Sequence, residues 1–128
     1  MARRPAEDVD RFRRLARQLP GVHGADLARA LTELARLQAC EGEVAQSLAS
    51  RQEALRILEA LEQRDPGTHR GALADALDEL ATALSRDGQA GPALDAARAA
   101  TDRYRELAVE QPGRHRPDLA MALNNLAA

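Results

Sequence analysis

The sequence contains no tryptophan, no lysine, one cysteine and only two aromatic residues, Phe12 and Tyr104. Because Cys40 is alone, an intrachain disulfide is excluded, which fits a reducing compartment. No apolar run approaches the roughly 18 residues that indicate a membrane span, and the basic N-terminus lacks the apolar stretch of a signal peptide. We therefore expect a cytoplasmic protein without a membrane segment.

The chain also lacks a large excess of charge of either sign. The chain has 18 arginines against 20 acidic residues, a formal net charge of −2, so no broad field should attract nucleic acid or anionic lipid. Arg3, Arg4, Arg11 and Arg14 do form a basic stripe, as nucleic-acid-binding helices have. Glu7 interrupts this stripe and stacking aromatics are missing, so we expect a solvated face and no nucleic-acid partner.

The apolar residues that are present favour helices. Hydrophobic residues make up 45% of the chain, and most are alanine and leucine, which are strong helix formers. Residues with β-branched side chains, which favour strands, are rare. The composition predicts an all-α protein.

A repeat with a period of 46 residues organises the chain. Residues 27–72 and 73–118 are identical at fifteen of 46 positions without a gap, and the pattern Leu-Ala-x-Ala-Leu-x-x-Leu-Ala occurs at 27–35, 73–81 and 119–127. Such self-similarity is typical of repeat architectures. The predicted units are a half-unit 1–21, a unit 22–67, a unit 68–113 and a half-unit 114–128, together forming one domain.

Each unit reads as two helices joined by a glycine turn. Leu27, Leu31, Leu34 and Gln38 follow helical spacing, and Gly42 ends that first helix as glycine does just past a helix end. A second helix follows, with Val44, Leu48, Leu55, Leu58 and Leu61 on its inner side. The Pro-Gly pairs at 20–21, 66–67 and 112–113 are expected to be loops. We predict six helices near 5–19, 25–40, 43–64, 71–86, 91–111 and 117–128.

These residues resemble the tetratricopeptide repeat family. The resemblance rests on Leu31-x-x-Leu34-Ala35, the glycine at 42, a small residue five positions later and Ala54. The segment "ALNNLA" at 122–127 is similar to the longer-period repeats of kinesin light chains and bacterial signalling proteins. The resemblance implies an α-solenoid, a superhelix of antiparallel helix hairpins that serves as a non-catalytic scaffold for protein binding. HEAT repeats are a minor alternative with a similar period.

The same resemblance implies that the first helix of each unit lines a concave groove for a peptide or protein partner. The expected groove residues are Arg29, Thr32, Arg36, Asp75, Asp78, Thr82, Met121, Asn124 and Asn125. Carboxamides can pair with any peptide backbone because they offer a donor and an acceptor. Asn124 and Asn125 fit this role, and they fit that of ordinary exposed helix residues equally well.

The end helices expose apolar residues in the pattern, which leaves two interpretations open. The chain is either a fragment, such as the regulatory arm of a larger signalling or ATP-dependent protein, or it associates with itself through these helices. We favour the fragment. The expected end face of the first helix includes Val9, and the self-association residues proposed from the sequence are Phe12, Leu15, Leu19, Leu119, Leu123 and Leu126.

No constellation of residues indicates catalysis. His23, His69 and His115 recur once per unit, too far apart to share a metal ion, and each follows a Pro-Gly pair where it is expected to help start a helix. Cys40 lies beside Glu41, and a carboxylate disfavours the thiolate. The pair Asp75 and Asp78 is read as a solvated helix face. We expect no enzyme activity, no metal and no cofactor.

Overall fold

The computed structural model describes residues 4–110 and residue 123, and the part it describes is helical with no strand. The described residues form five helices, α1 (Pro5–Gln18), α2 (Pro20–Cys40), α3 (Val44–Arg64), α4 (Arg70–Arg86) and α5 (Ala90–Glu110). The predicted all-α class is confirmed. The predicted sixth helix at 117–128 lies outside the described residues, apart from Leu123, which is helical.

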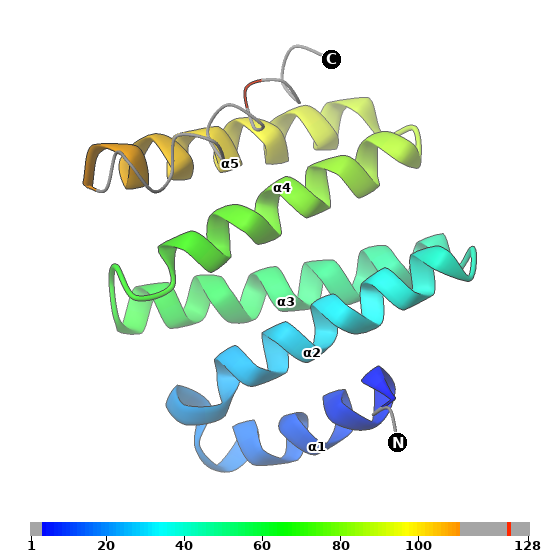
Figure 1. Ribbon diagram of the computed structural model, residues 1–128, viewed down its shortest axis with the longest axis vertical. Helices are drawn as coiled ribbons and strands as arrows, with labels where there is room; N and C mark the ends of the chain where they lie inside the picture. Colours follow the sequence, from blue (N-terminus) through cyan, green and yellow to red (C-terminus); the bar gives the residue numbers. More distant parts are fainter. Residues whose placement is uncertain (1–3, 111–122, 124–128) are drawn as a thin grey trace. The chain divides into compact units, whose positions relative to one another are not determined.

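The chain divides into two compact units, Met1–Pro66 and Gly67–Ala128. In the first, α1 packs against α2 and α2 packs against α3; in the second, α4 packs against α5 (Figure 1). Each unit therefore contains one complete antiparallel hairpin of the predicted kind. The solenoid arrangement of successive hairpins stays a prediction.

Glycine turns of one type join the helices within both hairpins. Gly42 and Gly88 have φ values of 80° and 79°, a region that side chains with a Cβ rarely adopt. In the first turn, the Glu43 N–H donates to the Gln38 carbonyl at 2.8 Å and the Gly42 N–H donates to the Ala39 carbonyl at 3.1 Å. The Gly88 turn repeats this pair of bonds, which defines the Schellman motif. The predicted glycine stops are confirmed.

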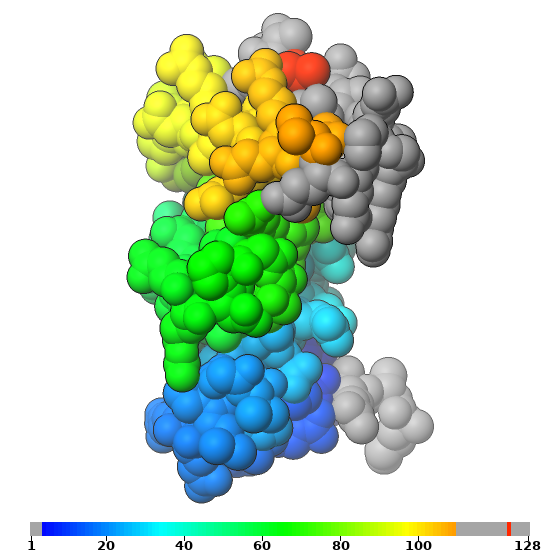
Figure 2. Space-filling view, turned by 90° about the vertical axis from the view of Figure 1, so that its left-hand side faces the viewer, coloured from blue at the N-terminus to red at the C-terminus, as the bar shows by residue number. Residues whose placement is uncertain are grey.

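The connection between α1 and α2 differs from the prediction. The pair Pro20-Gly21 was expected to be a loop, but α2 begins at Pro20, five residues before the predicted start. Proline suits the first helical position because it lacks the N–H that would have no partner there. The connection is therefore Leu19 alone, which is exposed. The surface formed by the end of α1 and the start of α2 is drawn in blue in Figure 2. Pro66-Gly67 does form a turn, and Gly67 has a φ of 99°.

The cores of the two hairpins use equivalent positions of the repeat. Leu27 and Leu73 are 6% and 1% exposed, and Ala35 and Ala81 are 0% and 4% exposed. The buried equivalents on the second helices are Ala54 and Ala100, Leu58 and Tyr104, and Leu61 and Leu107. Of the five inner positions predicted on α3, Val44 is wrong, because it lies at the exposed first residue of the helix.

A small residue lets α2 and α3 approach closely. Gly24 is buried in α2, and a Cβ added there would lie 3.2 Å from the Leu61 Cδ2. That distance is shorter than ordinary van der Waals contact, so the Leu61 side chain occupies the space a larger residue would need.

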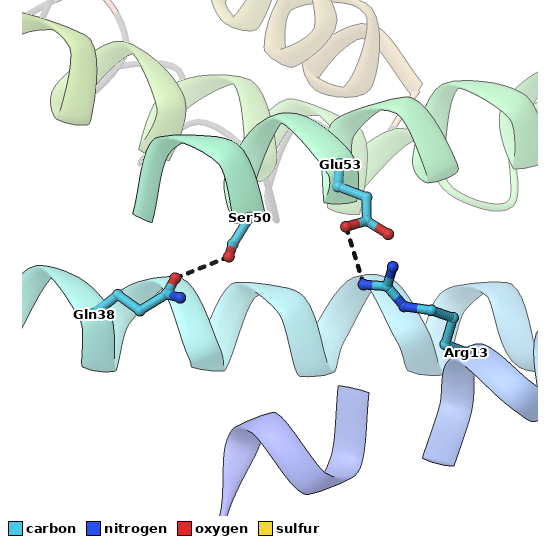
Figure 3. Close-up of polar contacts among 4 residues, drawn as sticks. All are labelled: Arg13, Gln38, Ser50 and Glu53. Atoms are coloured by element: carbon cyan, nitrogen blue, oxygen red, sulfur yellow. Dashed lines mark hydrogen bonds and ion pairs between the residues drawn. The ribbon is translucent and has the colours of Figure 1, made fainter. Parts of the chain in front are cut away.

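Polar side chains cross between helices in the first unit. Ser47 is buried and donates to the Ala35 carbonyl at 2.8 Å. Two further contacts appear in Figure 3, where the Ser50 hydroxyl donates to the Gln38 Oε1 at 2.8 Å and the Arg13 guanidinium donates to the Glu53 Oε1 at 3.1 Å. The second pair joins α1 to α3, so both helices bordering α2 are linked to each other.

The Gln38–Ser50 pair stands where the second unit has Leu84 and Ala96, which are 5% and 8% exposed. At this contact the first unit has a hydrogen bond, whereas the second unit has apolar packing. We predict that Gln38→Leu alone destabilises the first unit by about 1–2 kcal/mol, because buried Ser50 loses its acceptor. The double variant Gln38→Leu, Ser50→Ala should regain most of this loss. Urea denaturation of the wild type, both single variants and the double variant measures the coupling, and strictly additive effects would contradict it.

Candidate interaction surface

The exposed face of α2 is defined by Arg29, Glu33 and Arg36, spaced four and three residues apart, and is called the α2 polar face. Leu27, Leu31 and the small residues beside them turn the opposite side of the helix inward. With about 3.6 residues per turn, the intervening positions must face solvent. Two arginines and one glutamate give this face a formal charge of +1.

The corresponding side of α4 has the opposite charge: Asp75, Asp78, Glu79 and Thr82 stand at the positions of Arg29, Thr32, Glu33 and Arg36. Asp75 is exposed, Asp78 and Glu79 are half-buried, and together they form the α4 acidic face with a formal charge of −3. Asp75 accepts a hydrogen bond from the Tyr104 hydroxyl of α5. Because Tyr104 is itself buried, at 4% exposure, its hydroxyl is held in place and the second helix of the hairpin helps to fix this carboxylate.

The two predicted threonines are turned toward their own helices. Thr32 donates to the Ala28 carbonyl at 2.9 Å, and Thr82 donates to the Asp78 carbonyl at 3.1 Å. Both side chains are half-buried, and bonding to the carbonyl four residues earlier is a usual state for such hydroxyls in helices. Thr32 lies at the border of the α2 polar face, whereas Thr82 stands at the position of Arg36 in the 46-residue register, among the acidic residues of α4.

The described groove residues therefore fall into two groups. Arg29, Thr32 and Arg36 share the α2 side, and Asp75, Asp78 and Thr82 share the α4 side, as their spacing predicts. Met121, Asn124 and Asn125 lie outside the described residues. That these sets form one groove stays a prediction.

Sequence reasoning missed Glu33 and Glu79, which stand at equivalent positions of the two units. Glu33 is exposed, four residues after Arg29 and three before Arg36, a spacing that places all three on neighbouring turns of one face. The repeat alignment could have identified these two residues, because glutamate is identical at both positions while the flanking residues change charge.

The residues proposed for self-association have unequal exposure. Phe12 and Leu15 are half-buried, Leu19 is 55% exposed and Leu123 is 40% exposed. Leu119 and Leu126 lie outside the described residues. Val9, expected on the same end face, is buried at 4% exposure, so that expectation is wrong. Val9 is covered because α1 packs against α2. The sequence alone did not predict that this packing would bury Val9.

The arginines of α1 are partly engaged by their neighbours. The Arg11 guanidinium lies 4.7 Å from the centroid of the Phe12 ring and 3.5 Å from the Asp8 carboxylate. Arg4 and Arg14 are exposed, and Arg3 lies outside the described residues. The described part of the stripe thus mixes paired and solvated arginines.

The histidines take two different positions. His23 lies inside α2, with its Nδ1 3.7 Å from the Asp26 carboxylate, so its expected place before the helix is wrong. His69 does precede α4, where its backbone carbonyl accepts from the Leu73 N–H at 2.9 Å and its side chain makes no cap. His115 lies outside the described residues. Within the described part of the chain, no group of three His, Cys, Asp or Glu side chains could hold a metal ion, and Cys40 is exposed with a free thiol.

None of the described helices is long and apolar enough to cross a membrane. In comparisons with known proteins, no protein-family model, curated protein sequence or solved structure matches this chain significantly.

Proposed function

We propose that the protein is a non-catalytic interaction module that binds a peptide or protein segment on the exposed faces of α2 and α4. The observation that carries this proposal is the repetition of one hairpin with nearly constant core positions and reversed surface charge. Leu27, Leu73, Ala35 and Ala81 are all buried, whereas the faces beside them carry formal charges of +1 and −3. A rigid scaffold with variable surface residues suits recognition of other proteins.

The resemblance to tetratricopeptide repeats supports the same function, because first helices in that family line the partner groove. The charges of the two faces also indicate which charged residues the partner should carry. A segment bearing basic residues would complement the α4 acidic face, and an acidic residue would complement Arg29 and Arg36 on the α2 polar face. Electrostatic complementarity of this kind sets specificity and association rate.

Charge reversal on each face tests the proposal. Asp78→Arg and Arg36→Glu should each weaken binding to a captured partner or to peptides on an array about tenfold, equivalent to roughly 1.4 kcal/mol. Peptides selected by the wild type should be enriched in basic residues, and Asp78→Arg should shift this selection toward acidic ones. Affinity capture from cell extract, followed by titration of the captured protein, gives the measurement.

Matched controls are available on the second helices. Asp95→Arg on α5 and Arg56→Glu on α3 make the same charge changes at exposed positions outside both faces. Circular dichroism should show unchanged helix content for all four variants. Equal binding by the face variants and the controls would rule out the assigned surface.

A further inference from the structure

The second helices of the two hairpins have a face that first helices cover. On α3 this face includes Leu58 and Leu61, which are 5% and 6% exposed. On α5 the equivalents are Tyr104 and Leu107, at 4% and 7%, and both cluster with Ala74 of α4. The 46-residue register assigns the same two positions of α1 to Phe12 and Leu15.

Phe12 and Leu15 are only half-buried, although their equivalents are almost completely covered. The side of α1 that carries Val9 is already covered, because Val9 is buried and α1 packs against α2, whereas Phe12 and Leu15 lie successively further round the helix. We define Phe12 and Leu15 as the α1 apolar face. It is the second-helix half of a hairpin interface that occurs complete twice in the described residues.

The first-helix half of this interface is present a third time in the chain. Residues 119–127 repeat the pattern that supplies the covering face of α2 and α4. Leu123, the described member of this segment, is 40% exposed, whereas its equivalent Leu31 in α2 is 1% exposed. The sequence therefore holds both halves of one more hairpin interface. Phe12 and Leu15 of one half and Leu123, the described residue of the other, are incompletely covered.

We propose that the α1 apolar face binds residues 119–127 of a second copy of this chain, continuing the hairpin interface from one molecule to the next. This inference goes beyond the proposed function and uses other residues. The two surfaces differ from one another, so the contact is head-to-tail and adds copies in a row. The assembly should therefore grow with concentration instead of stopping at a dimer.

Asp8 makes this contact weaker than the hairpin interface inside the chain. It occupies the position of Ala54 and Ala100, which are 1% and 0% exposed, and it pairs with Arg11 at 3.5 Å on the surface of α1. Covering a carboxylate removes it from water and opposes association. The variant Asp8→Ala restores the alanine of the complete units, so it should associate about tenfold or more tightly than the wild type.

Sedimentation velocity over a wide concentration range tests the proposal on the full chain. The wild type should show an average mass that rises with concentration. Phe12→Asp and Leu123→Asp should each be monomeric. When the two are mixed, the intact tail of the first variant can bind the intact α1 face of the second, so the mixture should form heterodimers and nothing larger. Val109→Asp, at a position 83% exposed and outside the interface, should assemble like the wild type.

Circular dichroism of each variant reports whether it is folded. Leu123→Asp changes an exposed position, so it keeps the test valid even if Phe12→Asp disturbs α1. A wild type that stays monomeric at its highest soluble concentration would overturn the proposal. So would an unchanged association constant for Asp8→Ala, or a Leu123→Asp variant that assembles like the wild type.

Discussion

Replacing Leu31 by alanine should remove about 2–5 kcal/mol from the free energy of unfolding of the first unit. Leu31 is 1% exposed and is among the largest fully buried side chains of the described residues. Its position in α2, between the helices α1 and α3 that pack on either side, leaves little freedom for neighbours to fill the resulting cavity. Domains of this size have total stabilities of roughly 3–10 kcal/mol, so much of the unit should unfold.

The matched control is Leu37→Ala in the same helix. Leu37 is 41% exposed, so the same chemical change with the same difference in helix propensity should alter stability by less than about 1 kcal/mol. Urea denaturation followed by far-ultraviolet circular dichroism measures both variants. Equal losses for Leu31→Ala and Leu37→Ala would contradict the packing of α2.

Local features of the hairpins were predictable from the sequence because each depends on a few adjacent residues. Gly42 and Gly88 stand where apolar periodicity breaks, and a residue with positive φ just past a helix end is most often glycine. The buried positions follow from helical spacing, which does not depend on how hairpins are arranged. Both units therefore show the predicted core.

The start of α2 was not predictable in the same way. Proline is compatible with a loop and with the first turn of a helix, since its fixed φ suits both. Pro20-Gly21 and Pro66-Gly67 are identical pairs, yet Gly67 has a φ of 99° and Gly21 lies within a helix. The pair alone does not determine which of these conformations forms.

The sequence predicted which candidate surface residues face solvent, but it did not predict the hydrogen bonds that they make. Helical spacing brought Arg29 and Arg36 to the solvent side of α2. The hydrogen bond from Tyr104 to Asp75 depends on the register of α4 against α5 and on the length of the tyrosine side chain. Single-helix reasoning includes neither of these. The exchange of Gln38 and Ser50 for Leu84 and Ala96 was visible in the repeat alignment, but the hairpin register was needed to recognise the two positions as contacts.

Ala100→Asp should destabilise its unit even more than Leu31→Ala destabilises the first unit. Ala100 is 0% exposed and packs in the cluster with Ala74, Tyr104 and Leu107. An aspartate there places a carboxylate in an apolar contact between α4 and α5, and the penalty for an unpaired buried charge is several kcal/mol. The second unit should lose most of its structure at neutral pH. Tyr104 is the only tyrosine and no tryptophan is present, so intrinsic tyrosine fluorescence reports this unit.

The effect of this substitution should depend on pH with a definite sign. Burial disfavours the charged form and raises the pKa of the introduced carboxyl above its unfolded value of about 3.9. The unfolded state then binds fewer protons than the folded state between the two pKa values, so the variant loses stability as pH rises through that range. Relative to the wild type, Ala100→Asp should be least destabilised near the unfolded pKa and below it.

Asp8 provides the comparison, because the same residue type at the equivalent position of α1 is half-buried beside Arg11. Asp8→Ala should therefore change the unfolding free energy of the monomer by less than about 1 kcal/mol, and a loss comparable to that of Ala100→Asp would show that the two positions do not differ in burial as described.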